Sequence, residues 1–183
     1  YLLHRLENVN EKVAAKNNRK DALLVQKSMD GNIVFLYSYV TPEGDELNYM
    51  DNALNIPLSL KSNFKMSLKL DDAVRLIEKL DLDVAQLGEN KIRSTIIDLI
   101  SNQYLNFLSS YIKEHNVGYY TLATSFSELE AGFMDVISDA FTPYGMSVSD
   151  FIIKRISIPN DIKNKIEDLA FQIRQRKSSF EAD

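Results

Sequence analysis

The residues best suited to chemistry are one histidine and three pairs of acids. The histidine, His115, stands in the segment KEHNVGYY, which we expect to be a loop between two helices. The acidic pairs are Asp71/Asp72, Asp81/Asp83 and Glu128/Glu130. A general base needs a partner within hydrogen-bond reach, and no spacing in the sequence supplies one for His115. A hydrolase that uses His115 and an acidic pair is therefore the least favoured class of function.

Local structure explains the acids and the nearby hydroxyls without a catalytic role. An acidic pair could hold a divalent cation, but acids also gather at helix starts because they complement the helix dipole. Ser125 and Ser127 each stand three residues before a glutamate, the spacing of a capping box, so one of them is expected to begin a helix. The sequence contains no phosphate-binding loop, nucleophile elbow or zinc-protease motif. We therefore predict no catalytic residues, no metal site and no cofactor.

Composition narrows the classes of function further. The 183 residues include no cysteine, which excludes disulfides, thiol nucleophiles and cysteine metal sites. Two histidines are too few for a multi-histidine metal centre. The formal net charge of −5 and the isoelectric point near 5.1 argue against broad binding to nucleic acid. No nucleic-acid partner is predicted.

Alternation of apolar and polar residues predicts strands in the first part of the chain. Residues 21–40 hold two β-rich runs around Asp30-Gly31, a dipeptide typical of a hairpin turn. Both runs have apolar residues on each parity, so at least one strand is expected to be buried on both faces. Ile56–Leu70 alternates with period two, and its apolar side is broken only at Ser62. This stretch is either one long bent strand or two strands that meet near that serine.

Helical periodicity dominates the rest of the chain. Asp71 is expected to cap a short helix over residues 72–80, with Val74, Ile77 and Leu80 directed inward. Two longer helices follow, and their predicted inward residues are Ile92, Ile96, Leu99, Ile100 and Phe107 in the first and Leu129, Phe133, Val136, Ile137, Ala140 and Phe141 in the second. Pro143 and Gly145 end the second helix, and residues 148–158 have the β-branched content of a strand. Strands come mostly first and helices later, so the fold class predicted is α+β.

Three units are predicted along the chain. Residues 1–20 are an N-terminal helix and linker, residues 21–159 are the domain, and residues 160–183 begin a C-terminal coiled-coil helix. Asn160 or Asp161 is expected to cap that helix. Its apolar residues recur at the spacing of a coiled-coil seam, and we predict that this seam joins protomers. The seam residues are Ile162, Ile166, Leu169 and Ile173. A single amphipathic helix packed back on the sheet has the same pattern over this length and is the alternative.

Three segments together resemble a known family. They are NIPLSLKSNFKMSLKLDDAVRLIEKL, KIRSTIIDLI and TSFSELEAGFMDVISDAFTPYGMSVSDFIIKRISIPNDIKNKIE. The first resembles a strand pair that leads into an aspartate-capped helix, the second a central helix, and the third a closing unit of helix, turn, strand, proline and helix. These segments are similar to those of the SPFH or Band 7 superfamily, which includes stomatins, prohibitins, flotillins and bacterial relatives. The similarity covers about residues 56–167.

The resemblance implies assembly rather than catalysis. It implies an SPFH/Band 7-like domain with a mainly antiparallel sheet packed by helices, followed by a helix that starts a coiled coil. It also implies a homo-oligomer in contact with membrane lipid or membrane proteins, and it supplies no catalytic residues. The leading hypothesis is a non-enzymatic scaffold that organises membrane patches or partner proteins. The alternative is a soluble adaptor module that binds another protein through the surface of its sheet.

The location implied is cytoplasmic or peripheral to a membrane. In the second case, a segment before Tyr1 would anchor the chain. Residues 1–16 are then either an amphipathic helix docked on its own domain or the end of a longer helix that leaves the anchor. The bacterial branch of the superfamily includes soluble members, so both locations stay open.

Overall fold

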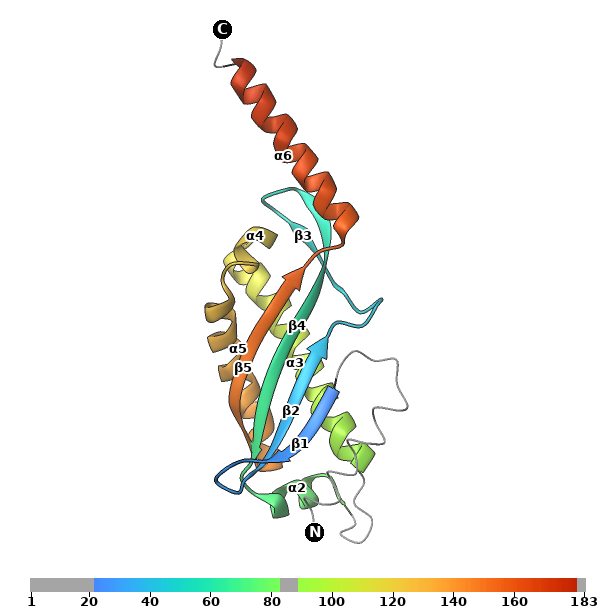
Figure 1. Ribbon diagram of the computed structural model, residues 1–183, viewed down its shortest axis with the longest axis vertical. Coiled ribbons are helices and arrows are strands. Elements are labelled where there is room, and N and C mark those ends of the chain that lie inside the picture. The colour runs from blue at the N-terminus through green and yellow to red at the C-terminus, as the bar shows by residue number, and fades with distance from the viewer. Residues whose placement is uncertain (1–21, 83–88, 181–183) are drawn as a thin grey trace.

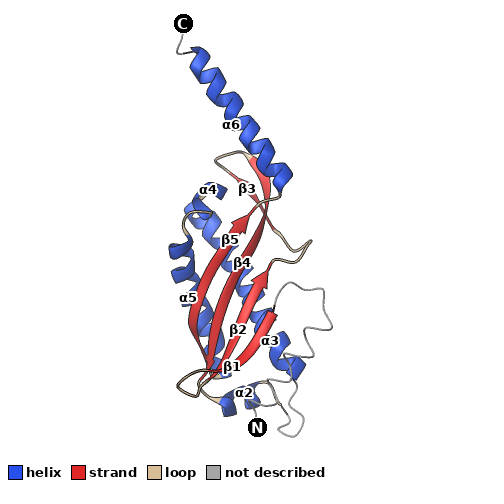
Figure 2. Ribbon diagram, viewed as in Figure 1, coloured by secondary structure: helices blue, strands red, loops and turns tan. Residues whose placement is uncertain are grey.

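The computed structural model describes residues 22–82 and 89–180 (Figure 1). A five-stranded sheet forms one layer, helices form a second layer against it, and the last helix extends away from one end (Figures 1 and 2). The predicted α+β class is confirmed. The helix predicted within residues 1–20 lies outside the described residues.

The predicted hairpin is formed by β1 (Ala22–Lys27) and β2 (Ile33–Val40). The inward residues of the two strands are Leu23, Val25, Phe35, Tyr37 and Tyr39, and all of them are buried. The expectation that one strand is buried on both faces is wrong, because Leu24 on the outer face of β1 is 50% exposed and Leu36 on β2 is only half-buried. The hairpin therefore leaves apolar side chains on the outer face of the sheet.

The centre of the sheet is β4 (Ile56–Leu70), one continuous strand of 15 residues. β2 pairs with its residues 63–70, and β3 (Leu47–Asp51) pairs with its residues 56–60. β5 (Met146–Ser157) runs along residues 61–70, with two register shifts that allow the pair to bend. Every pairing among the described strands is antiparallel. The alternative of two separate strands over this stretch is therefore wrong.

The helical layer covers the other face of the sheet. Its helices are α2 (Ala73–Lys79), α3 (Glu89–His115), α4 (Tyr119–Leu122), α5 (Phe126–Phe141) and the 3₁₀ turn η1 (Thr142–Tyr144), and α6 (Asn160–Phe180) follows β5. α3 and α5 lie along the sheet, whereas α2 and α6 lie at its opposite ends (Figure 1). Pro143 in η1 and Gly145, whose φ is +69°, end α5 as predicted.

The core between the layers is aromatic and centres on Phe64 of β4. Its ring centroid lies 4.6 Å from that of Tyr104 on α3 and 5.1 Å from that of Phe151 on β5. Phe133 of α5 completes the group, 4.8 Å from Phe151. The hydroxyl of Tyr104 donates a 2.9 Å hydrogen bond to Oγ of Ser62, so a buried phenol finds its partner at the polar break in β4.

The structure corrects the prediction for α2. Asp72 rather than Asp71 caps the helix, and its carboxylate accepts a 3.0 Å hydrogen bond from the main-chain N–H of Arg75. Val74, predicted to face inward, is exposed, and Leu76 is buried instead. Leu76 and Leu80 are four residues apart and share the buried face with the half-buried Ile77, whereas Val74 projects about 200° from Leu76.

Corrections at α5 and α6 also concern helix starts and faces. Ser125 precedes α5 as one of the two predicted caps, but its side chain makes no capping hydrogen bond. Val136, predicted to face inward, is exposed. Asn160 and Asp161 both lie in the first turn of α6, so neither is a cap. Helix ends of this kind depend on packing that local sequence does not record.

Candidate interaction surface

The four residues of the predicted seam on α6 fall into two pairs that differ in exposure. Ile166 is buried against the domain, and Ile162 is half-buried there. Leu169 and Ile173, one and two turns further, are 49% and 55% exposed. Beyond Ile166 the helix extends away from the other described elements (Figure 1). The alternative of a helix packed back on the sheet therefore holds for the root of α6 and not for its continuation.

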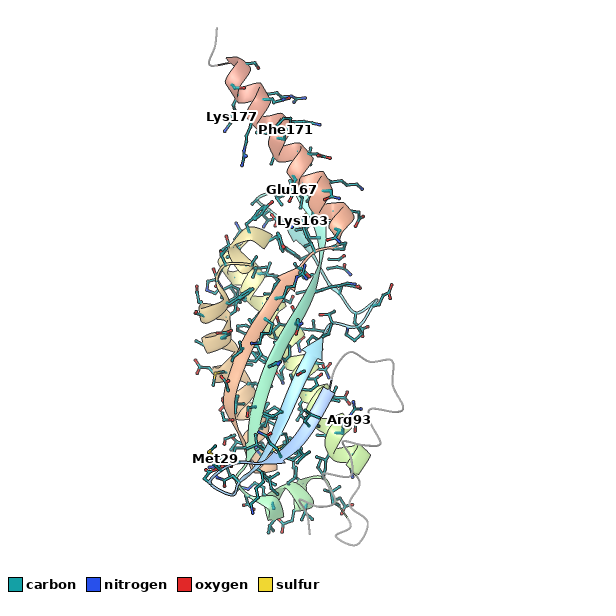
Figure 3. All side chains as sticks on the ribbon, viewed as in Figure 1. Met29, Arg93, Lys163, Glu167, Phe171 and Lys177 are labelled. Carbon is teal, nitrogen blue, oxygen red and sulfur yellow. The ribbon has the colours of Figure 1, made fainter. Side chains whose placement is uncertain are left out.

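Phe171 is 61% exposed on the same projecting part of α6, and the apolar spacing of the helix did not predict it (Figure 3). Residues two positions apart on a helix project about 200° apart, so Phe171 lies opposite Leu169 and Ile173. A prediction based on one apolar face of a helix omits a residue on the opposite face. The available signal was a single aromatic residue on an otherwise polar helix face. The projecting part of α6 thus has apolar side chains on two faces.

The charge of α6 is uneven along its length. All three acids of the helix, Asp161, Glu167 and Asp168, precede residue 169. Residues 169–180 contain Arg174, Arg176 and Lys177 and no acid. Cations near a helix C-terminus are favourable because they complement the partial negative charge of the last carbonyls. The projecting half of α6 is therefore both apolar and basic.

His115 is the last residue of α3 and does not lie in a loop, which corrects the prediction. Its Nδ1 lies 3.1 Å from the carbonyl oxygen of Tyr111, and the two rings stack at 4.3 Å. The hydroxyl of Tyr111 hydrogen bonds to Glu128 of α5, and burial together with this carboxylate raises the pKa of Tyr111. The histidine therefore packs at a helix end without a hydrogen-bonded acid among the described contacts.

Members of two of the acidic pairs also make contacts within the domain. Glu130 accepts a 2.7 Å hydrogen bond from the main-chain N–H of Ile153, and Asp71 lies 3.7 Å from the ammonium group of Lys69. Asp83 lies outside the described residues. Over residues 22–82 and 89–180, no three acids or histidines gather in a group that could hold a metal ion. The contacts of Glu130 and Asp71 are therefore structural ones.

The outer face of the sheet is a second surface of interest. A shallow hollow of about 250 Å³ is lined by residues of four strands, including Leu24, Leu36, Lys65 and Ile152. Leu24 and Ile152 are exposed there. Apolar side chains on a sheet face that no described helix covers can contact a partner, although single exposed residues are also common on protein surfaces.

The antiparallel sheet, the helical layer and the projecting helix together define the class of protein. The chain belongs to the SPFH domain-Band 7 family, whose model matches residues 51–173. The match begins at the last residue of β3 and reaches into the projecting part of α6. Domains of this family are generally non-enzymatic scaffolds. No curated protein matches the chain. Among the described helices, none is both long and apolar enough to cross a membrane.

Proposed function

We propose that this chain is a non-enzymatic scaffold that assembles with copies of itself through the projecting half of α6, in association with a membrane. The observation that carries the proposal is the exposure of Leu169 and Ile173 on a helix that Ile166 fixes to the domain. Both residues continue the spacing of the buried seam into solvent. Their exposure supports a helix that is completed by another copy.

The energetics favour a helical partner for this seam. Burying a leucine or isoleucine side chain stabilises a contact by about 1.5–3 kcal/mol. Two such residues on each of two helices therefore supply several kcal/mol, which offsets part of the entropy lost on association. The buried root at Ile166 holds the helix in one direction, so less freedom is lost when copies meet. A membrane or a larger assembly would reduce that loss further, since it raises the local concentration.

The test is a double substitution, Leu169→Glu with Ile173→Glu, in the full chain. The mass of the assembly, measured by light scattering after size-exclusion chromatography, is expected to fall. The urea midpoint of the domain, compared at concentrations where both proteins are monomeric, is expected to stay within experimental error. Leu24→Glu is the matched control, because this leucine is 50% exposed on the sheet and Leu169 is 49% exposed on α6. An unchanged mass for the double variant would overturn the proposal.

The membrane part of the proposal rests on membership of the SPFH domain-Band 7 family. It predicts that the chain sediments with phospholipid vesicles. Vesicles with and without anionic lipid separate attraction by the basic residues of α6 from binding that does not depend on charge. Failure to sediment with either kind of vesicle would remove the membrane from the proposal and leave the assembly intact.

A second function, an adaptor that captures another protein on its sheet, is favoured by the hollow around Leu24 and Ile152. The same control variant tests it. If Leu24→Glu abolishes capture of one partner at fixed stoichiometry and the chain is monomeric, the adaptor is the better description. If Leu24→Glu changes neither capture nor mass, the sheet face is an ordinary surface.

A further inference from the structure

A groove of about 600 Å³ lies between α3 and α5, on the surface of the helical layer. Its apolar lining comes from Phe107 and Tyr111 of α3 and from Val136 of α5. Gly132 lies against Phe107, and a Cβ at that glycine would come within 3.1 Å of the ring. The absence of a side chain at Gly132 therefore lets the ring of Phe107 pack against α5, and the groove lies beside this contact.

The groove is acidic. Glu114 and Glu128 line it from the two helices. Asp135 and Asp139 lie three residues from the groove residues Gly132 and Val136 on α5, and this helix has no lysine or arginine. A ligand for this surface should therefore combine an apolar or aromatic side chain with positive charge.

The projecting half of α6 has this composition on one face. Phe171 and Arg174 are three residues apart and project about 60° from each other, and Ser178 falls close to Phe171 on the same face. Both Phe171 and Arg174 are exposed. In Figure 1 this half of α6 points away from α3 and α5, so a chain cannot fill its own groove.

We propose that the Phe171–Arg174 face of α6 in one copy docks into the groove between α3 and α5 of a second copy. Phe171 would contact the apolar lining, and Arg174 would lie near Glu114 and Glu128. This contact deepens the proposed scaffold function, because Leu169 and Ile173 on the opposite face stay free for a helix–helix seam. Each chain would then meet two neighbours through two different surfaces.

The test uses the absence of cysteine from the chain, which makes any introduced thiol unique. Copies with Ser110→Cys, in the groove, are mixed with copies of different mass that carry Ser178→Cys, and a short bis-maleimide is added. The expected result is a heterodimer more abundant than either homodimer. Ser179→Cys is the matched control, because it lies about 100° round the helix from residue 178. A heterodimer yield no greater than that of the control overturns the proposal.

Charge exchange gives a second, independent readout. Arg174→Glu should lower the heterodimer yield by up to about five-fold, the worth of an exposed ion pair. Arg176→Glu changes the charge equally but lies about 200° from Arg174, and it should leave the yield unchanged. Glu114→Lys in the groove copy should restore the yield with Arg174→Glu, whereas Asp98→Lys on the same helix should not. Equal effects of Arg174→Glu and Arg176→Glu would show non-specific attraction and overturn the proposal.

The groove contact can fail separately from the proposed function. Phe171→Ala should weaken the heterodimer about ten-fold, because it removes the aromatic side chain that would be buried. The Leu169→Glu and Ile173→Glu variant should keep the heterodimer while the larger assembly is lost. If large assemblies form but the cysteines at positions 110 and 178 do not cross-link, the proposed scaffold function stands and the groove contact is overturned. If the cross-link forms but assembly does not depend on Leu169 and Ile173, the groove contact stands and the proposed scaffold function is overturned.

Discussion

The main-chain N–H of Tyr119 donates a 2.7 Å hydrogen bond to Oδ2 of Asp51, which lies 68 positions earlier in the chain. Asp51 is fully buried, and its Oδ1 accepts 3.0 Å hydrogen bonds from the main-chain N–H groups of Ala53 and Leu54. The hydroxyl of Tyr49 is a fourth donor, at 3.1 Å to Oδ2. One carboxylate therefore ties the turn between β3 and β4 to the start of α4.

Replacing this carboxylate should destabilise the domain strongly. Asp51→Ala leaves the main-chain donors of Ala53, Leu54 and Tyr119 without a partner in a buried site, so we expect a loss of about 3 kcal/mol or more. Asp51→Asn keeps one oxygen but turns an NH₂ group toward a donor, and we expect about 2 kcal/mol. Urea denaturation measures both values.

The control for this prediction is Asp45→Ala, which removes an acid from the exposed loop between β2 and β3. A change within about 0.5 kcal/mol is expected there. If Asp51→Ala cost no more than Asp45→Ala, the tie between the turn and α4 would contribute nothing to stability.

Two glycines with positive φ give a matched pair for a second prediction. Gly44 has φ +92° and no neighbour within 4 Å of a built Cβ, whereas the Cβ of an alanine at Gly145 would lie 2.3 Å from the carbonyl oxygen of Asp72. Gly44→Ala should cost about 1 kcal/mol, the strain of a left-handed backbone. Gly145→Ala should cost at least about 2 kcal/mol more, because η1 and the start of α2 must move apart. Thermal or urea denaturation of the two variants provides the measurement, and equal losses would contradict the close packing at Gly145.

The sequence predicts those strands and turns whose apolar alternation or turn residues lie within the element itself. Ile56–Leu70 faces the helical layer with one side only, so strict alternation is enough to find it. The hairpin of β1 and β2 is equally local, because its turn residues fix its geometry. β3 was not predicted, since LNYMD is short and its last residue, Asp51, is a buried acid held by contacts from α4.

The interaction surface shows a different limit of sequence analysis. Ile166 and Leu169 are equivalent in the apolar spacing of α6, but one is buried on the domain and the other is exposed. The position at which a helix leaves its domain depends on where the sheet ends, which the spacing does not record. Phe171 was not predicted for a related reason. It is the only apolar residue proposed for its face of α6, and a single residue shows no periodicity.

Tyr104 gives a prediction about pH. Burial raises the pKa of its phenol above the ordinary value near 10, although the hydrogen bond with Ser62 opposes the shift. The unfolded chain therefore loses this proton first, so the contribution of Tyr104 is intact below about pH 10 and falls above it by up to about 1.4 kcal/mol per pH unit. Tyr104→Phe should be about 1 kcal/mol less stable at pH 8 and should lack this part of the alkaline slope.

Ser62→Ala is the control for Tyr104. It removes the same hydrogen bond at pH 8 but keeps the buried phenol, so the alkaline slope should remain. Urea denaturation at pH 8, 10 and 11 separates the two variants. Parallel pH profiles for the wild type and Tyr104→Phe would show that this tyrosine does not contribute to the alkaline loss.

The boundary between the domain and the projecting helix can be measured with two truncations in α6. Ile166→Ala removes a side chain buried against the domain, so it should lower the free energy of unfolding by about 3 kcal/mol. Leu169→Ala, one turn further, should change it by less than about 0.5 kcal/mol, because its side chain has few domain contacts to lose. Both values are taken by urea denaturation at concentrations where light scattering shows a monomer, since assembly would stabilise the chain through Leu169. Equal losses at the two positions would mean that α6 packs on its own domain well past Ile166, and the seam at Leu169 and Ile173 would then be unavailable to another copy.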